Sequence, residues 1–372
     1  MKTKRNRIFK LILFLIIILS LFDSCNLNIE SNKSNLEDTG SNKNLQTKID
    51  SMLWLKSSAG IRGIFEDSKG NLWFTSTEFV SMYDGSKHTY FTENDGLDGI
   101  GMVHEDQSGT VWVEDGFKAY SYDGLRFTSH TLKPDTTGHK WDASIHDLWF
   151  QKGIPRFGDS DGPPGVYRNH DGEIEFLPFP VPKTNSDDNL YYPTTKAIHG
   201  KDGTIWFGTM EKVIGFKNGS FTVIGREEMG RKDDPGNVGI RGLYADSKGR
   251  LWMADNGSGV FVYEKDTVIN FTKLHKMDKG DREGNTLHRA FSIAEDNDGN
   301  MWFGTVYNGI WRYDPDLDGI GGNSFTNYAE KQGVISDNIW TIYKTPKGEL
   351  LFAGENPGAV YKFNGQGFDR VY

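Results

Sequence analysis

The sequence predicts an all-β fold, a seven-bladed β-propeller whose blades are four-stranded antiparallel sheets. Three observations predict it: a phrase that recurs along the chain, the even spacing of its copies, and four short strand-like runs in each repeat. The clearest copy is DNDGNMWFGT (296–305), in which turn residues precede a Trp-centred apolar run. Propeller blades repeat about every 40–50 residues, and no blade can bury its faces alone.

Four further copies of the phrase are clear and two are weak. The clear ones are DSKGNLWFTS (67–76), DQSGTVWVED (106–115), KDGTIWFGT (201–209) and DSKGRLWMAD (246–255). The weak ones are HDLWF (146–150), which has no glycine, and TPKGELLFAG (345–354), which has leucine in place of tryptophan. The marker residues, spaced by about 46 positions on average, are Trp73, Trp112, Trp149, Trp206, Trp252, Trp302 and Leu351.

Each repeat is expected to hold four strands in order. An apolar run such as IRGIFED (61–67) comes first, and a turn rich in Asp, Ser, Asn and Gly follows it. Asp can accept hydrogen bonds from its own backbone and Gly can take a positive φ, so this segment predicts a tight hairpin. The Trp-centred run has the β-branched and aromatic residues of a strand. A third run ends on an aromatic residue, and a fourth carries Phe and Thr, as in INFTKL (269–274).

The ring is expected to close with the last residues of the chain. GFDRVY (367–372) supplies a fourth strand for the last blade, and MLWL (52–55) could add an outer strand or clasp that blade. The Trp and Asp–Gly positions recur in most repeats, so they serve what every blade needs, namely packing between blades and the turn. We therefore interpret them as structural rather than as ligand contacts.

Residues 1–25 have the pattern of a targeting segment. Five basic residues lie within the first ten, and an apolar run covers residues 11–22, which is short for a membrane span. Cys25 follows this run closely. It is the only cysteine, so no internal disulfide can form. The arrangement resembles the bacterial lipoprotein signal, which implies cleavage before Cys25 and its diacylation. The alternative is an uncleaved anchor, and both alternatives place the rest of the chain outside the cytoplasm.

The remainder divides into a tether and the propeller. Residues 26–50 are rich in Asn, Ser, Lys and Asp and cannot bury a core, so a flexible tether is expected. Residues 51–372 form the predicted propeller, a single domain. Acidic residues outnumber basic ones by 51 to 42, which argues against binding to nucleic acid or to anionic lipid surfaces.

The repeat phrase, followed by a strand that ends on Tyr and by DGL (95–97), resembles the two-component-regulator propeller repeat. The resemblance covers residues 58–372 and is strong in blades 1, 2, 5 and 6. It implies the fold of the periplasmic sensor domains of bacterial hybrid histidine kinases, notably those that respond to glycans. The chain shows no counterpart of the kinase, the second propeller or the Tyr-rich β-sandwich, so the resemblance implies ligand binding and no signalling chemistry.

The DG-x-x-WF spacing of residues 202–207 is also similar to that of the streptogramin lyase group, which is seven-bladed too. That activity depends on histidine and an acidic metal site near the axis. Those residues have no one-to-one match in this chain, so no activity is transferred. A lyase or hydrolase with a metal-assisted funnel site is the alternative to a non-enzymatic binder.

Long connections are expected to gather on one rim of the ring. Residues 131–144, 182–194, 226–238 and 274–289 join fourth strands to the next first strands, and 151–164 joins the second and third strands of blade 3. Such insertions on one rim of a repeat array often mark a binding face. The side chains of interest in them are Trp141, Tyr191, Tyr192, His139, Lys232, Asp233, Asp234 and His288.

The axial funnel on this rim is predicted to hold a ligand. The starts of inner strands would contribute Arg62, Lys196, Arg241 and Trp340. The loops between second and third strands would contribute Glu78, Glu114, Asp115, Glu211, Asp255, Asn256, Tyr307, Asn308, Glu355 and Asn356. Cations beside acids and aromatic rings suit a sugar or a carboxylate, with Glu78, Glu211 and Asp255 offsetting the cations in the empty protein. The alternative is that these are ordinary solvated loop residues.

Motifs for catalysis and metal binding are few. The nine histidines are scattered over several repeats, and His104, His146 and His199, on or near inner strands, are expected to be packed. Asp314, Asp316 and Asp318 match the first half of a calcium loop, although Phe325 stands where a bidentate Glu is expected. A structural Ca²⁺ site and a plain acidic turn are both open.

The leading hypothesis is a non-enzymatic, lipid-anchored propeller in a bacterial cell envelope, facing the periplasm or the exterior. It would bind a carbohydrate, another anionic small molecule or a protein partner, and it would be a monomer. A scaffold for other envelope proteins is a third hypothesis, which a broad apolar patch on the rim would favour.

Overall fold

The computed structural model describes residues 59–135, 140–153, 162–181, 188–231, 239–279, 286–318 and 324–372. All of them belong to one compact unit within residues 44–372. The expected signal segment with Cys25, the tether and the MLWL run lie outside these ranges, so those predictions are untested. Within the described ranges, no helix combines the length and the apolarity needed to cross a membrane.

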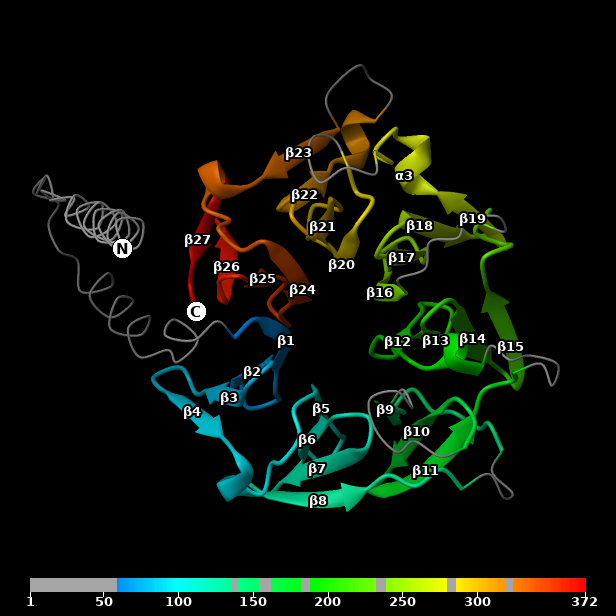
Figure 1. Ribbon diagram of the computed structural model, residues 1–372, viewed down its shortest axis with the longest axis vertical. Coiled ribbons are helices and arrows are strands. Elements are labelled where there is room, and N and C mark those ends of the chain that lie inside the picture. The colour runs from blue at the N-terminus through cyan, green and yellow to red at the C-terminus, as the bar shows by residue number, and fades with distance from the viewer. Residues whose placement is uncertain are drawn as a thin grey trace, which may run out of the picture. The chain divides into compact units, whose positions relative to one another are not determined.

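Seven antiparallel sheets stand around a central axis and follow one another round the ring in chain order, from blue to red (Figure 1). Blades 1 and 2 contain β1 (Ile61–Glu66), β2 (Leu72–Ser76), β3 (Val80–Tyr83), β4 (His88–Phe91), β5 (Met102–Glu105), β6 (Val111–Glu114), β7 (Lys118–Tyr122) and β8 (Phe127–Thr131). Blades 3 and 4 contain β9 (Leu148–Gln151), β10 (Gly165–His170), β11 (Glu173–Pro178), β12 (Ile198–His199), β13 (Ile205–Gly208), β14 (Val213–Lys217) and β15 (Ser220–Ile224).

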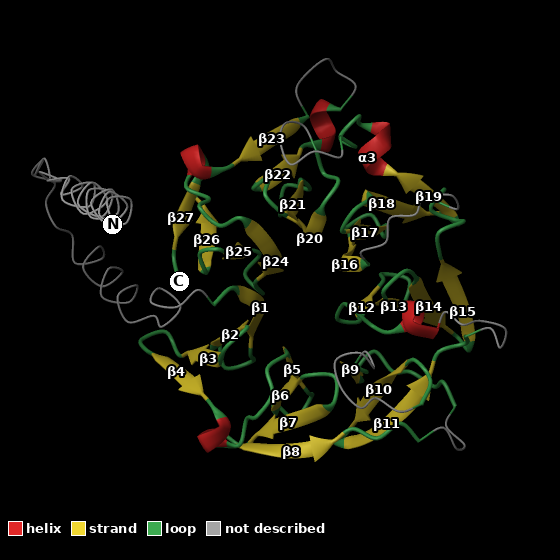
Figure 2. Ribbon diagram, in the orientation of Figure 1, coloured by secondary structure: helices red, strands yellow, loops and turns green. Residues whose placement is uncertain are grey.

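Blades 5, 6 and 7 complete the ring. They contain β16 (Ile240–Ala245), β17 (Leu251–Asp255), β18 (Gly259–Glu264), β19 (Thr267–Asn270), β20 (Ala290–Glu295), β21 (Met301–Thr305), β22 (Ile310–Tyr313), β23 (Phe325–Tyr328), β24 (Asn338–Lys344), β25 (Leu350–Glu355), β26 (Ala359–Phe363) and β27 (Phe368–Arg370). Short helices lie in the connections: η2 (Glu93–Asp95), η4 (Asp188–Tyr191), α3 (Phe271–Leu274), η5 (Pro315–Leu317) and η6 (Glu330–Gln332). Figure 2 shows how small the helical part is beside the strands. The predicted seven-bladed propeller is confirmed.

Blade 3 departs from the prediction of four strands per blade. Its sheet has the order β11-β10-β9, so in the described part of the chain β9 is its innermost strand. Residues 140–147, which directly precede β9, run without strand pairing. The other six sheets have four strands each. Blade 3 is also the repeat whose HDLWF phrase lacks glycine, so its hairpin signal was weak in the sequence.

The recurring tryptophans pack between blades, as predicted. All six are at most 6% exposed. Each contacts an aromatic ring of the next blade, in the pairs Trp73–Phe127, Trp112–Phe150, Trp149–Phe207, Trp206–Tyr263, Trp252–Phe303 and Trp302–Phe352. Aromatic pairs at such distances add to the apolar burial that stabilises the ring.

The Asp–Gly turn joins the hairpin to this packing. In blade 5, Asp246 Oδ1 accepts hydrogen bonds from the backbone N–H groups of Lys248 and Arg250, at 2.9 and 2.8 Å. Asp246 Oδ2 accepts the indole N–H of Trp252 at 2.8 Å. The same three-way contact recurs at Asp67, Asp106 and Asp296. The glycine of the turn has φ of about +80° in these four copies, the conformation that favours glycine.

One predicted strand is half helix. The Phe–Thr run INFTKL was expected to be the fourth strand of blade 5, but β19 ends at Asn270 and α3 begins at Phe271. Asn270 caps that helix, because its side chain accepts the backbone N–H of Lys273 at 2.9 Å. Phe271 still packs inward, against Trp252 and Tyr313.

Candidate ligand-binding site

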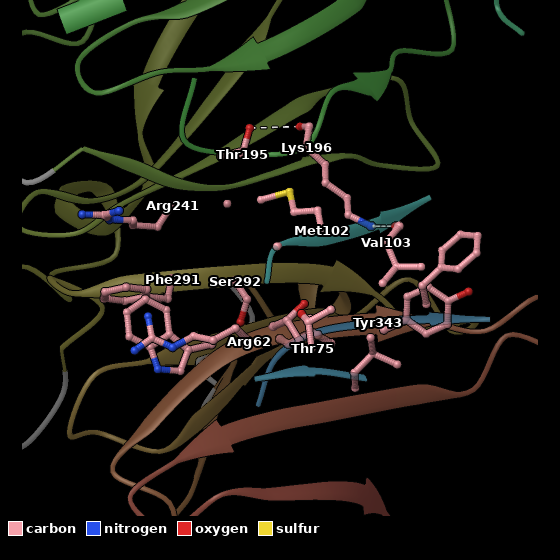
Figure 3. A pocket seen from close by; sticks show the side chains of 18 of the residues that line it. Arg62, Thr75, Met102, Val103, Thr195, Lys196, Arg241, Phe291, Ser292 and Tyr343 are labelled. Atoms are coloured by element: carbon pink, nitrogen blue, oxygen red, sulfur yellow. Dashed lines mark hydrogen bonds between the residues drawn. The ribbon is translucent and has the colours of Figure 1, made fainter. Parts of the chain in front are cut away.

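A channel with a volume of about 790 Å³ lies at the centre of the ring. Residues from all seven blades line it, including Leu148 of β9, the innermost strand of blade 3. This volume is within the range of about 300–1,000 Å³ typical of small-molecule sites. Figure 3 shows part of the lining.

Four inner strands begin with the same irregularity. Strand pairing shifts by one residue between Ile61 and Gly63 in β1, and at the equivalent places in β16, β20 and β24. The residues skipped by the shift are Arg62, Arg241, Phe291 and Trp340, and all four line the channel. A bulge of this kind leaves one residue out of the ladder and re-aims its side chain. Repetition of the bulge therefore supplies a set of side chains at one level of the channel.

Glycine follows both arginines because neighbouring atoms lie close to these positions. A Cβ at Gly63 would lie 2.6 Å from Thr75 Oγ1, and one at Gly242 would lie 2.6 Å from the backbone oxygen of Phe291 in the next blade. Both distances are too short for a side chain. Each of the two IRG sequences, at 61–63 and 240–242, thus places an arginine on the channel wall beside a glycine that lies close to atoms of a neighbouring strand.

The four bulge residues form a row, Arg62–Trp340–Phe291–Arg241, which we call the cation–aromatic row. The Arg62 guanidinium lies 3.7 Å from the centre of the Trp340 ring. Trp340 meets Phe291 edge to face with ring centres 4.4 Å apart, and the Arg241 guanidinium lies 5.9 Å from the Phe291 ring. Cations at these distances from an aromatic face are attracted to it. Phe291 was not among the predicted site residues, since a lone Phe in an apolar run resembles a core residue.

Glu355 holds one end of the row. Its Oε1 accepts a hydrogen bond from Arg62 Nη2 at 2.8 Å, and its Oε2 accepts the indole N–H of Trp340 at 2.6 Å. One carboxylate therefore orients both side chains. Glu355, rather than the predicted Glu78, offsets the charge of Arg62. Glu78 itself is exposed in the turn between β2 and β3.

The other predicted funnel residues do not line the channel. Glu211 forms an ion pair with Arg226 at 2.7 Å. Asp255 pairs with Arg231 at 2.9 Å with both side chains buried, and desolvation raises the Asp255 pKa against the opposing effect of Arg231. Tyr307 is 43% exposed, with a positive φ of 64°. The prediction that Glu78, Glu211, Asp255 and Tyr307 lie beside the channel cations is therefore corrected. Glu211 and Asp255 pair with other arginines, and Glu78 and Tyr307 lie in turns between strands.

The third predicted cation lies deeper. The Lys196 side chain extends toward Val103 of β5 and away from Arg241 (Figure 3). Its Nζ donates a hydrogen bond to the Val103 carbonyl oxygen and lies 5.4 Å from the Phe65 ring. Desolvation lowers the pKa of Lys196 to about 8, although the charge of Glu114 acts in the opposite direction. The three cations therefore do not share one mouth.

Glu114 and His104 accompany Lys196 in what we call the interior cluster. Glu114 is 2% exposed, and its Oε1 lies 3.7 Å from His104 Nε2. Burial, followed by the charge of Asp115, raises the Glu114 pKa to about 8 against the effects of backbone N–H groups and of Lys196. Burial, helped by Lys196, holds the His104 pKa well below its usual value. The cluster joins blades 2 and 4, which flank the three-stranded blade 3.

The remaining candidates fall into two groups. Tyr191 and Tyr192 are buried, and Trp141 packs on Trp149 and Phe216, so these rim aromatics belong to the core. His139 and residues 232–234 lie outside the described ranges. Among the histidines, His104 is packed as predicted, whereas His146 and His199 are exposed.

Two of the three carboxylates of the predicted calcium loop, those of Asp314 and Asp318, have different hydrogen-bond partners. Asp314 caps η5, accepting the backbone N–H of Asp316 at 3.0 Å, and Asp318 accepts the Tyr313 hydroxyl at 3.0 Å. Within the described ranges, no group of three or more His, Cys, Asp or Glu residues could hold a metal ion. Calcium binding stays a prediction, tested by whether EDTA lowers the melting temperature.

Comparison with known proteins agrees with this architecture. Residues 287–307 match the family model described as two component regulator propeller, so the chain is a propeller that carries this repeat. Comparison with curated proteins found no match. The extracellular domain of a protein described as a one-component system from B. thetaiotaomicron is similar at 17% identity with a TM-score of 0.57. This chain is covered over 82% of its length and spans only 38% of that domain.

A structure of YCF48 bound to a D1 peptide is similar too, at 12% identity with a TM-score of 0.52, covering 82% of this chain and 91% of that one. At these identities the likeness concerns the fold.

Proposed function

We propose that this protein is a non-catalytic, extracytoplasmic propeller that binds an anionic ligand, such as an acidic sugar, in its central channel. The observation that carries the proposal is the cation–aromatic row, in which four blades each contribute one bulged residue to the channel wall. Guanidinium groups bind carboxylates in a planar, two-bond geometry, and aromatic faces cover apolar ligand surface. The similarity to an extracellular sensor-type domain supports a binding role outside the cytoplasm.

Lipid attachment is part of the proposal and rests on the sequence around Cys25. The acyl chains would hold the propeller at a bacterial envelope membrane. Mass spectrometry of the mature N-terminus should find an acylated Cys25. A mature chain that begins elsewhere removes this part of the proposal and leaves the channel unaffected.

The binding site is tested by a thermal-shift screen of glycans and small organic acids, because a ligand of the folded state raises the melting temperature. For a ligand so found, Arg62→Ala and Arg241→Ala should each weaken binding by about 1.5–3 kcal/mol, the size of a charge-assisted hydrogen bond. Both variants should melt near the parent temperature, since the channel is open to water.

Two controls accompany this test. Arg126→Ala removes an exposed arginine of a surface hairpin and should bind as the parent does. Arg62→Ala combined with Glu355→Gln also removes the negative charge that loses its ion-pair partner in the first change. If both single arginine variants keep the parent affinity, the row is not the binding site.

A lyase or hydrolase is the second candidate, and the interior cluster favours it. Displaced pKa values on Glu114, Lys196 and His104 beside a cavity are typical of catalytic groups as well as of buried ion networks. If the parent protein turns over the ligand and Glu114→Gln abolishes this turnover, the proposed function becomes catalysis instead of binding alone.

A further inference from the structure

Lys196 is a cation inside the channel with no carboxylate at ion-pair distance among the described residues. Its ammonium group has three donors, and the structure shows one acceptor, the Val103 carbonyl oxygen. The Phe65 ring lies 5.4 Å from Lys196 Nζ, and apolar side chains such as Met102 and Ile342 also line the channel. Removing an ammonium ion from water without a paired anion is costly.

Glu114 only partly offsets this charge. It influences the pKa of Lys196 at a distance, but the two do not form an ion pair. Glu114 Oε1 and His104 Nε2 are both buried and have no hydrogen-bond partner in the part of the chain that the structure describes. Buried polar atoms are nearly always paired, so unpaired ones next to a cavity point to a missing group. The interior cluster is thus incomplete as a protein-only network.

We propose that the channel interior holds a second anion subsite, in which the Lys196 ammonium group receives a carboxylate carried by the ligand. This rests on the proposed function and adds a substrate class to it. The ligand would be an elongated acid whose charged end reaches past the cation–aromatic row to Lys196. One ammonium group offsets one negative charge, which suits a carboxylate such as that of a uronic acid. The carboxylate would accept the donors that Val103 leaves unused.

The test uses D-glucuronate as the probe and D-glucose as its uncharged counterpart, with binding measured by calorimetry on the full chain. The parent should bind D-glucuronate more tightly than D-glucose. Lys196→Met, which keeps length and removes charge, should weaken D-glucuronate binding about tenfold or more. Lys196→Arg should restore part of it.

Lys217→Met is the matched control. Lys217 belongs to the same blade and pairs with Asp202 on the surface at 2.9 Å, so its loss should not change binding. Lys196→Met should fold, because an apolar side chain is well accommodated where a buried cation stood; its melting temperature checks this. D-glucuronate binding that is absent in the parent, equal to that of D-glucose, or unchanged in Lys196→Met overturns the subsite.

The outcome separates this subsite from the row. If the arginine variants lose affinity while Lys196→Met does not, the row stands and the interior subsite falls. If Lys196→Met loses affinity and the arginine variants do not, the subsite stands and the ligand lies deeper than the row. A screened ligand that depends on the arginines while D-glucuronate fails to bind also overturns the subsite alone.

Discussion

Glu114 shows how a single position acquires its properties from the whole ring. It ends a VWVE strand that differs little from its counterparts in other blades. Yet it is 2% exposed, beside His104 and within the influence of Lys196 from a blade two places away. Burial favours its neutral form, since a charged carboxylate loses its hydration there.

This burial predicts a pH dependence of stability. The folded-state pKa of Glu114 is raised from 4.5 to about 8, so the folded protein keeps a proton that the unfolded chain releases. The contribution of Glu114 to stability is complete below pH 4.5 and is lost as pH rises to about 8. Glu114→Gln cannot titrate, so its melting temperature should fall less than that of the parent over this window.

The contribution of Lys196 to stability changes with pH in the opposite direction and over a different pH range. Its pKa is lowered from 10.5 to about 8, so its contribution is present above pH 10.5 and is lost as pH falls toward 8. The parent should therefore gain more stability than Lys196→Met between pH 8 and 10.5.

Glu78→Gln, at an exposed turn, serves as the control for Glu114→Gln. Identical pH profiles for the parent and Glu114→Gln would contradict the buried, uncharged state of Glu114.

At the scale of the element, the Asp–Trp turn is the repeated device that joins a hairpin to the core. Asp246 is fully buried and receives the indole of Trp252 together with two backbone N–H groups and Arg250 Nε. Blade 3 lacks this device. Its Asp147 binds the backbone N–H of Ser144 and the ring of His170, and Trp149 Nε1 has no partner in the described residues.

Loss of one such turn should be costly. Asp246→Ala leaves several buried donors unpaired, and hydrogen bonds to a charged group are worth about 1.5–3 kcal/mol each. We expect the free energy of unfolding to fall by at least about 3 kcal/mol, measured by urea denaturation with tryptophan fluorescence. Asp123→Ala, in an exposed turn where the carboxylate binds only the backbone of residues 125 and 126, should change it little. Equal effects of the two changes would show that the buried turn has no special role.

At the scale of the whole molecule, the C-terminus closes the ring. Strand β27 is the outer strand of blade 7, and Tyr372 lies 5.3 Å from Phe74 and 5.5 Å from Tyr83 of blade 1, measured between ring centres. The Val360 N–H also donates to the Tyr372 carbonyl oxygen at 3.0 Å. The last residues thus pair within blade 7 and pack on the blade that begins the chain.

Deletion of residues 366–372 should therefore destabilise the ring. It removes the buried Phe368, whose loss alone costs about 3–5 kcal/mol, and exposes the edge of β26. At about 2–4 °C for each kcal/mol, the melting temperature should fall by roughly 10 °C, as calorimetry would show. Gln366→Ala, an exposed change in the preceding turn, is the control. A deletion variant that melts with the parent would mean that closure does not depend on these residues.

The sequence by itself determined the number of blades, the order of strands within them and the role of the Trp and Asp–Gly positions. These features depend on contacts between residues close in the chain, such as Asp246 and Trp252, and they recur, so one clear copy supports the weaker ones. The same patterns placed Arg62, Lys196, Arg241 and Trp340 on the channel wall, because the start of an inner strand is recognisable in their repeats.

Only the tertiary structure decided which side chains meet. Arg62 and Glu355 are 293 residues apart, and Lys196 and Val103 are 93 apart, so their pairing depends on how the blades are arranged in the ring. Phe291 lines the channel because of a bulge in β20 that no residue pattern in the sequence predicts. Each of these contacts lies between blades, where the partner is set by packing of the complete ring rather than by the local sequence.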